Sequence, residues 1–190
     1  DGDCFNAFLL EQLAGGAHRA AHRNGGLHKA HAYARLAGDF VQRGAQAAAR
    51  QMVAQRAADP AGPDGGSAGT YGGRIVFSSS VTGAVALRDC SAYAVTKAGL
   101  VHMARVLGLE LGGYGITVNA LAIGAILNER NLRDDPDYDA HWAGVNPTNK
   151  CGRPADVANA LLYLTSPQAH MVNGHTLTID GGWSTVGRVP

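Results

Sequence analysis

The amino-acid sequence predicts an α/β fold, in which helices flank a parallel β-sheet. Three short, mostly apolar runs, at residues 74–79, 115–123 and 175–179, are typical of buried strands. Segments with helical periodicity separate them, and strands that alternate with helices are expected to pair in parallel. With 190 residues the chain can form one domain with a sizeable core, so we predict a single domain over residues 1–190.

The amino-terminal part of the chain, residues 1–58, is predicted to be mainly helical. Residues 37–58 show this best, because their apolar side chains recur at the helical period of 3.6. Two prolines and six glycines then fill residues 60–73, which predicts a loop.

The first strand and the helix after it are predicted from two clear signals. The strand, residues 74–79, reads RIVFSS and ends in serines. A helical pattern then covers residues 91–111, and the two glycines that follow it are a common signal for the end of a helix. The second strand is predicted at residues 115–123.

A polar segment, residues 127–150, separates the second strand from the next helix. It is rich in Asn, Asp and Arg and is predicted to be a mobile excursion over the sheet. Pro154 stands where a proline in the first turn of a helix belongs, so a helix is expected over residues 155–165. The third strand, residues 175–179, completes the alternation.

The composition excludes several functional classes. Apolar residues make up 46% of the chain and charged residues 16%, which excludes a disordered tail. A formal net charge of +1 gives no electrostatic footprint for nucleic acid or an anionic membrane. Apolar runs fall short of the roughly 20 residues of a membrane span, and the start of the chain lacks a secretory pattern. Three widely separated cysteines predict no disulfide framework and a cytoplasmic location.

The stretch SAYAVTK, residues 91–97, holds two residues that point to chemistry. Tyr93 and Lys97 are four positions apart, so their side chains share one face of the predicted helix. An ammonium group close to a phenol favours the phenolate, and such a tyrosine can exchange a proton with an alcohol or a carbonyl. On spacing alone, one turn of an ordinary buried helix remains the better interpretation.

Ser80 strengthens the chemical interpretation. It lies thirteen residues before Tyr93, where the first strand ends. Ligands of open parallel sheets bind at the carboxyl ends of the strands. A hydroxyl group there can hydrogen-bond the same substrate oxygen that Tyr93 protonates.

Five segments of the chain resemble a known family in their order and spacing. They are GGRIVFSSSVTG, SAYAVTKAGLVHMARVLGLEL, GITVNALAIGAI, GRPADVANALLYLTS and VNGHTLTIDGG. Together they resemble the second half of a short-chain dehydrogenase/reductase. The resemblance covers residues 72–183 and extends more loosely back to Arg35.

The resemblance implies a truncated or atypical Rossmann-type sheet and a role for each site residue. Ser80 would position the substrate oxygen, and Tyr93 would be the acid/base. Lys97 would favour the phenolate and hold the nicotinamide ribose of NAD or NADP, and Tyr93 and Gly124 would also lie against the cofactor. Ile126, two residues beyond Gly124, resembles the position whose backbone meets the nicotinamide carboxamide.

The sequence also departs from the family pattern. It has neither a TGxxxGxG turn nor an NNAG strand end, and residues 14–22, AGGAHRAAH, cannot replace that turn. The first half of the dinucleotide fold is therefore expected to be absent or replaced by helix. Arg35, Ile123 and Asn128 stand where the family has asparagine, proline and threonine.

Three functions follow from these matches and departures. The first is an NAD(P)-dependent oxidoreductase that acts on a small carbonyl or alcohol. The second is an acid/base enzyme without a cofactor, such as a dehydratase, cyclase, isomerase or epoxide-processing enzyme. The third is a non-catalytic, truncated family member, whose first strand would expose an open edge to a partner.

Three other candidates have simpler explanations. His18 and His22 have metal-ligand spacing, but a solvated His/Arg face explains them better, so no metal site is predicted. Cys90 precedes the tyrosine helix and is expected to be a small, half-buried residue rather than a nucleophile. Residues 129–139 mix acidic residues with arginines, as a solvated surface does, although they could also grip a charged substrate.

The family resemblance also implies a homodimer or a homotetramer. Met103, Val106 and Leu107 are predicted to form an outward apolar face beside the helix at residues 47–52.

Overall fold

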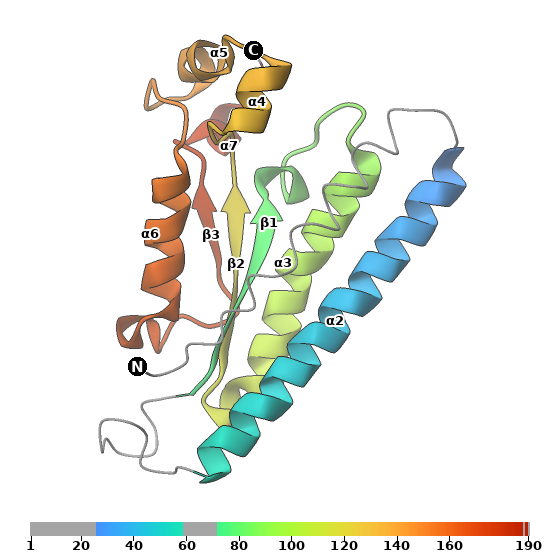
Figure 1. Ribbon diagram of the computed structural model, residues 1–190, viewed down its shortest axis with the longest axis vertical. Coiled ribbons are helices and arrows are strands. Elements are labelled where there is room, and N and C mark those ends of the chain that lie inside the picture. Colours follow the sequence, from blue (N-terminus) through green and yellow to red (C-terminus); the bar gives the residue numbers. More distant parts are fainter. Residues whose placement is uncertain (1–25, 59–71, 188, 190) are drawn as a thin grey trace.

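The computed structural model describes residues 26–58, 72–187 and 189, and only the backbone of residues 26–38 and 40 (Figure 1). The predictions for His18, His22 and residues 14–22 lie outside the described residues, and so does most of the predicted loop at 60–73.

The strands form a parallel sheet in the order β1-β2-β3, as predicted. Strand β1 spans Arg74–Ser80, β2 spans Thr117–Ile123 and β3 spans Thr176–Ile179. Strand β2 begins two residues later than expected, because Gly115 adopts a left-handed φ of 72° and closes the turn before it. Within the described chain β1 pairs only with β2, so its other edge carries no described strand.

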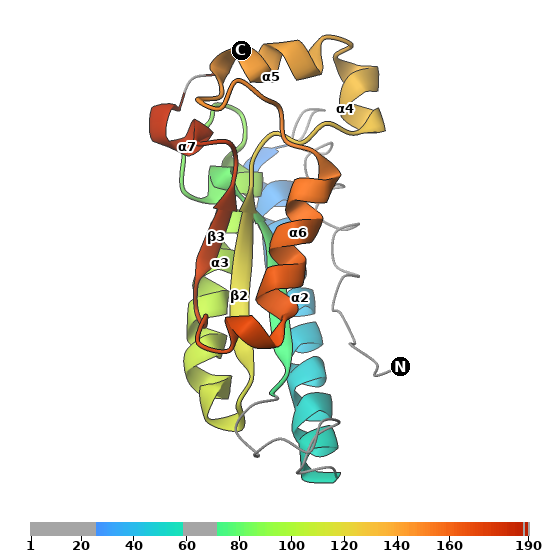
Figure 2. The same cartoon turned by 90° about the vertical axis from the view of Figure 1, so that its left-hand side faces the viewer.

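Helices cover both faces of this sheet (Figures 1 and 2). Helix α2, Gly26–Ala58, and helix α3, Ser91–Leu111, lie on one face, and helix α6, Pro154–Thr165, lies on the other. The bounds of α3 are those predicted, and α6 begins with Pro154 in its first turn. The predicted three-layer α/β arrangement is confirmed.

The main core fills the space between the sheet and the α2–α3 pair. Alternate residues of β1, Ile75 and Phe77, point to this face and are at most 5% exposed. Helix α2 contributes Ala45 and Ala49, whose small side chains let it approach closely. All buried members of this cluster are Ala45, Ala49, Ile75, Phe77, Ala104, Leu107, Ile116, Val118 and Ala120.

This core corrects one prediction about α3. Leu107 is only 7% exposed and belongs to the core, and Met103 packs against it. Of the predicted outward face only Val106, at 40% exposed, points to solvent. The prediction was wrong because α2 and the sheet together cover more of α3 than one amphipathic face.

The segment predicted as a polar excursion contains two short helices above the carboxyl ends of the strands (Figure 1). They are α4, Glu129–Asp134, and α5, Tyr138–Val145. Trp142 of α5 packs edge to face on Trp183, the first residue of the short helix α7, Trp183–Val186, with 5.8 Å between ring centroids. The segment is therefore anchored to the end of the sheet.

Two asparagines connect the amino-terminal ends of β2 and β3. Asn173 accepts a hydrogen bond from Val118 N at 2.9 Å and donates to Gly108 O of α3, also at 2.9 Å. Fully buried Asn119 donates to Val172 O at 2.8 Å and accepts from His175 N at 3.0 Å. These amides satisfy backbone groups at the turn into β3 that strand pairing leaves unmatched.

None of the helices in the described part of the chain combines the length and apolar character needed to cross a membrane.

Two glycines of α3 offer a matched test of the contact with Asn173. A Cβ on Gly108 would lie 2.7 Å from Asn173 Oδ1, whereas a Cβ on Gly99 would meet nothing within 4 Å. We expect Gly108→Ala to lower the free energy of unfolding by about 1–3 kcal/mol through overpacking. Gly99→Ala should instead raise it by up to about 1 kcal/mol, since alanine is the better helix former. Urea denaturation followed by circular dichroism measures both, and equal effects would contradict this account.

Candidate active site

The carboxyl end of β1 is joined to α3 by two buried hydrogen bonds. Ser79 Oγ donates to the carbonyl oxygen of Lys97 at 2.7 Å. Lys97 Nζ donates in return to the carbonyl oxygen of Ser78 at 2.8 Å. The Lys97 residue is only 5% exposed, so its ammonium group is held inside the protein at the edge where ligands of parallel sheets bind.

Tyr93 lies one turn before Lys97, on the same face of α3. The ammonium nitrogen of Lys97 is 5.5 Å from the centroid of the half-buried Tyr93 ring. A cation at this distance interacts with the ring face. Lys97 has three donor hydrogens, so its bond to Ser78 leaves capacity for other acceptors.

Ser80 ends β1 and caps the short turn Val81–Gly83. Its Oγ accepts hydrogen bonds from Thr82 N at 3.3 Å and from Thr82 Oγ1 at 3.0 Å. The bond from Thr82 N uses the oxygen as an acceptor, whereas the bond between the two hydroxyl groups can run in either direction. The hydroxyl proton of Ser80 can therefore be donated to Thr82 Oγ1 or to a ligand.

Gly83 allows this turn to touch α3. A Cβ at this position would lie 2.9 Å from Ala98 N and 3.0 Å from the carbonyl carbon of Lys97. No larger residue fits without moving the turn or the helix. The contact joins the turn that carries Ser80 to the helix that carries Tyr93 and Lys97.

Gly124 follows β2 at the same edge of the sheet. Its nitrogen donates to Ile179 O at 2.9 Å, and a Cβ there would lie 2.6 Å from the Cβ of Asp180. A glycine is therefore required by the packing of β2 on β3, whatever else it contacts.

Ile126 lies in a parallel bridge with Gly152. Leu127 N donates to Gly152 O at 2.8 Å, and Gly152 N donates to Ala125 O at 3.1 Å. Because the neighbours of Ile126 make these bonds, its own N–H faces the opposite side, where no described group accepts it. This amide is free to meet a ligand at the edge of the sheet.

Asn128 and Asn131 support the loop that carries Ile126. Asn128 caps α4 by accepting from Asn131 N at 2.9 Å. Asn131 Nδ2 donates to Ile126 O at 2.8 Å. Asn128 thus has a structural role at the position where the family resemblance places a threonine.

Sequence reasoning missed three residues that shape this site. Ser79 lacks the thirteen-residue offset to Tyr93 that singles out Ser80. The alternation of side chains along a strand would nevertheless have predicted that Ser79 points toward the helix. Gly83 and Asn131 give no pattern in the sequence, because their partners are backbone atoms brought close by the fold.

The charged residues of α4 and α5 pair with one another or with residues of the adjoining loops. Asp135 accepts from His141 at 2.9 Å, and this hydrogen bond raises the pKa of the imidazole. Burial, followed by the charges of Cys151 and Asp135, raises the pKa of Tyr138 to about 12. Arg153 binds Asp139 at 2.8 Å, and Arg130 lies 3.8 Å from Asp134. These ion pairs fit the solvated-surface interpretation of residues 129–139.

Other candidates show no catalytic arrangement in the part of the chain that the structure describes. Cys90 is half-buried at the start of α3 and makes no capping bond with its side chain. Burial and the charge of Asp139 raise the pKa of the Cys151 thiol, which disfavours its reactive thiolate. No group of three or more His, Cys, Asp or Glu that could hold a metal occurs among the described residues.

The chain matches a family of known proteins over most of its length. Residues 29–184 match the family described as "Enoyl-(Acyl carrier protein) reductase". The chain belongs to the short-chain dehydrogenase/reductase family. Its sheet is the Rossmann-type sheet expected from the sequence, although only three strands lie in the described part.

Family members of known identity resemble the chain over part of their length. Galactitol 2-dehydrogenase of Cereibacter sphaeroides is 36% identical over 59% of this chain and 46% of its own length. L-Rhamnose-1-dehydrogenase of Scheffersomyces stipitis is 35% identical over 72% of this chain and 48% of its own length. The chain thus spans about half the length of the curated relatives it matches.

A solved structure in the family shows the same arrangement. It is a gluconate 5-dehydrogenase from Burkholderia cenocepacia, solved in complex with NADP and tartrate. It has a TM-score of 0.68 and 29% identity, over 85% of this chain and 58% of its own.

The serine contact between β1 and α3 can be tested by a pair of substitutions. Ser79→Ala removes a buried hydrogen bond to Lys97 O, so we expect the free energy of unfolding to fall by about 1 kcal/mol. Ser166→Ala removes a bond of the same length to Tyr163 O at an exposed helix end, and a smaller loss is expected. Denaturant titration of both variants measures the difference. A loss for Ser166→Ala at least as large as for Ser79→Ala would contradict the importance of the buried contact.

Proposed function

We propose that this chain carries the proton-transfer site of an NAD(P)-dependent oxidoreductase that interconverts an alcohol and a carbonyl compound. The observation that carries the proposal is the buried ammonium of Lys97 beside the ring of Tyr93. Burying a cation is unfavourable unless specific partners offset the loss of water. A lysine serving only to pack α3 would be replaced by an apolar residue at little cost.

Tyr93 is the proposed acid/base. In the direction of oxidation the phenolate accepts the hydroxyl proton of the substrate, and in the direction of reduction the phenol returns it to the forming alkoxide. Lys97 favours the phenolate electrostatically and so brings this exchange toward neutral pH.

Ser80 is the proposed positioning group for the substrate oxygen. The proton that it can donate to a ligand supports this role, since an oxygen held by Ser80 lies next to the turn that contacts α3. Hydrogen-bond donors that are already in place stabilise the negative charge that develops on such an oxygen.

The residues at the sheet edge fit a nicotinamide dinucleotide. The outward N–H of Ile126 can donate to a carboxamide, and the ammonium of Lys97 can donate to ribose hydroxyls. Because Gly124 carries no side chain, a ligand can approach the backbone at this edge of the sheet. A bound dinucleotide would accept the hydride in the direction of oxidation and supply it in the direction of reduction, which no side chain of the protein can do. Solved relatives with bound NADP support this assignment.

Relatives support a polyhydroxylated alcohol as the substrate. Those named above, together with D-threitol dehydrogenase of Mycolicibacterium smegmatis, carry sugar or polyol names. We include such compounds within the proposed class of small alcohols and carbonyls.

The proposed assembly is a homodimer or a higher homo-oligomer formed through α3. Its outward face carries Val95, Gly99, His102, Val106 and Leu109, spaced alternately four and three residues apart. Val95 is 65% exposed and Leu109 is 86% exposed. In an antiparallel pair centred on His102, Val95 of one copy faces Leu109 of the other, as a two-fold interface requires.

Removing the Tyr93 hydroxyl tests the acid/base role. We expect Tyr93→Phe to lower kcat for alcohol oxidation by about 10²- to 10⁴-fold while NADH or NADPH binding, followed by fluorescence titration, changes little. Lys97→Met should move the activity profile to higher pH, because the phenolate loses its neighbouring cation. The exposed Tyr114 provides the control Tyr114→Phe, which should keep full activity.

Two outcomes would overturn the proposal. The first is an absence of dinucleotide binding at millimolar NADH and NADPH. The second is turnover that requires Tyr93 but no dinucleotide, which would instead indicate an acid/base enzyme without a cofactor.

Light scattering tests the proposed interface. Wild-type protein should have at least the mass of a dimer, and Leu109→Arg should shift it to the monomer, since two arginines and a lost apolar contact weaken the pairing. Leu162→Arg on α6 makes the same change at a position 67% exposed and should leave at least a dimer. A monomeric wild type, or an unchanged mass for Leu109→Arg, would contradict the assignment.

A further inference from the structure

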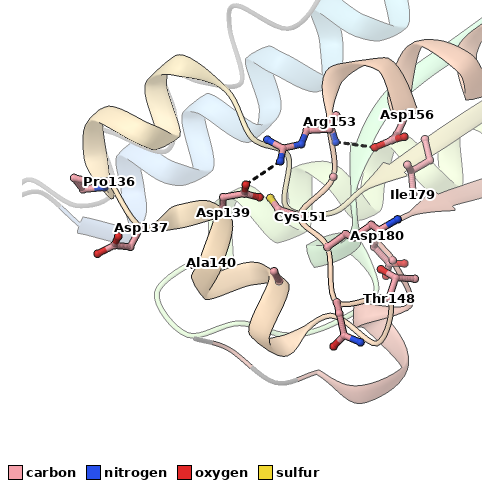
Figure 3. A pocket seen from close by; sticks show the side chains of 15 residues that line it. Pro136, Asp137, Asp139, Ala140, Thr148, Cys151, Arg153, Asp156, Ile179 and Asp180 are labelled. Carbon is pink, nitrogen blue, oxygen red and sulfur yellow. Dashed lines mark hydrogen bonds and ion pairs between the residues drawn. The ribbon is translucent and has the colours of Figure 1, made fainter.

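A pocket of about 1000 Å³ lies between α5, the loop at residues 148–153, the start of α6 and the end of β3 (Figure 3). Four aspartates, two basic residues and two neutral polar residues line it, together with smaller apolar groups. None of these residues belongs to the proposed acid/base site.

The bridge between Ile126 and Gly152 separates the pocket from that site. Gly152 and Cys151 line the pocket, whereas the free N–H of Ile126 faces the other way. Different residues of helix α5 likewise contact the end of the sheet and the pocket. Its Trp142 packs against Trp183, and its Ala140 and Ala143 line the pocket.

Three of the four aspartates are held by donors of the protein itself. Asp139 binds Arg153 at 2.8 Å, and Asp156 accepts from the backbone nitrogen of Arg153 at 2.7 Å (Figure 3). Asp180 accepts from Gly182 N at 2.9 Å and from Ser184 N at 2.8 Å. An ionised carboxylate offers about four lone-pair positions, so each retains the capacity to accept from a ligand.

Donors to a ligand come from the loop. Thr148, Asn149 and Lys150 line the pocket in sequence, and the exposed ammonium of Lys150 makes no hydrogen bond or ion pair within the described structure. Against four aspartates, Lys150 and Arg153 leave the lining with a formal charge of −2. The lining therefore both donates and accepts hydrogen bonds but disfavours an anion.

A buried amide holds the loop that carries these donors. Asn146 is 4% exposed and donates through Nδ2 to Lys150 O at 2.6 Å. A Cβ on Gly181, which lines the pocket, would be 3.3 Å from the same Nδ2. Asn146 therefore lies behind the wall and supports Lys150 in its place in the lining.

We propose that this pocket is a second binding site, for a polyhydroxyl compound without negative charge, such as a sugar or an open-chain polyol. Each hydroxyl group donates one hydrogen bond and accepts others, which matches a lining of mixed donors and acceptors. An anion would meet net negative charge, and an apolar ligand would remove water from carboxylates without replacing it. The inference does not rest on the proposed redox function.

Three compounds with one carbon skeleton test the ligand class. D-Glucitol is neutral, D-gluconate is anionic and D-glucamine is cationic, and isothermal titration calorimetry measures the binding of each. We expect D-glucitol and D-glucamine each to bind at least fivefold more tightly than D-gluconate, since the lining carries net negative charge. Binding of D-gluconate as tight as that of D-glucitol would overturn the proposal.

Two tryptophan substitutions locate the site. Ala140→Trp fills the pocket and should weaken D-glucitol binding at least tenfold, whereas Ala158→Trp, on the exposed side of α6, should leave it within twofold. Circular dichroism and melting temperature show whether both variants fold as the wild type does. Should Ala140→Trp not fold, Ala143→Phe fills the pocket with a smaller ring.

Tyr93→Phe separates this site from the proposed acid/base site. Binding in the pocket should persist in this variant with an unchanged affinity. Binding lost in Tyr93→Phe but kept in Ala140→Trp would place the polyol only at the acid/base site and would overturn the inference. A failure of the redox proposal appears separately, as absent dinucleotide binding or turnover.

Discussion

The buried ammonium of Lys97 imposes the main constraint on this structure. A cation withdrawn from water needs acceptors at fixed positions, and the carbonyl oxygen of Ser78 is one of them. That acceptor lies where β1 ends. The bond therefore fixes the position of α3 along β1 and the rotation of α3 about its own axis. The Ser79 bond to Lys97 O and the close approach of Gly83 hold the same alignment from two other directions. These contacts also fix the position of Tyr93, which lies on the same helix.

Much of this arrangement could be predicted from local patterns. The apolar runs and the helical period between them gave the order of strands and helices, and Pro154 marked the start of α6. The pair Tyr93 and Lys97 was recognisable because helical geometry converts a spacing of four into a shared face. Both kinds of signal depend only on neighbours in the sequence.

Features that depend on distant contacts could not be predicted in this way. The polar segment before α6 contains α4 and α5, and α5 is held in place by the packing of Trp142 on Trp183, forty-one positions further along the chain. Leu107 is buried because α2, which precedes β1, covers a second side of α3. The role of Gly83 depends on backbone atoms of α3 that only the folded chain brings close. Hydrophobic periodicity contains no information about such partners.

The bridge between Ile126 and Gly152 has a thermodynamic consequence. Gly152 lies two residues before α6 and follows the connection from α5, so the bridge joins the segment between these helices to the amide proposed to meet the nicotinamide. A ligand that displaced α5 would act on the Ile126 amide through this bridge. Reciprocity of linked equilibria would then require each ligand to change the affinity for the other by the same factor. Cooperation between the two ligands would thus be built into a bridge of two backbone hydrogen bonds.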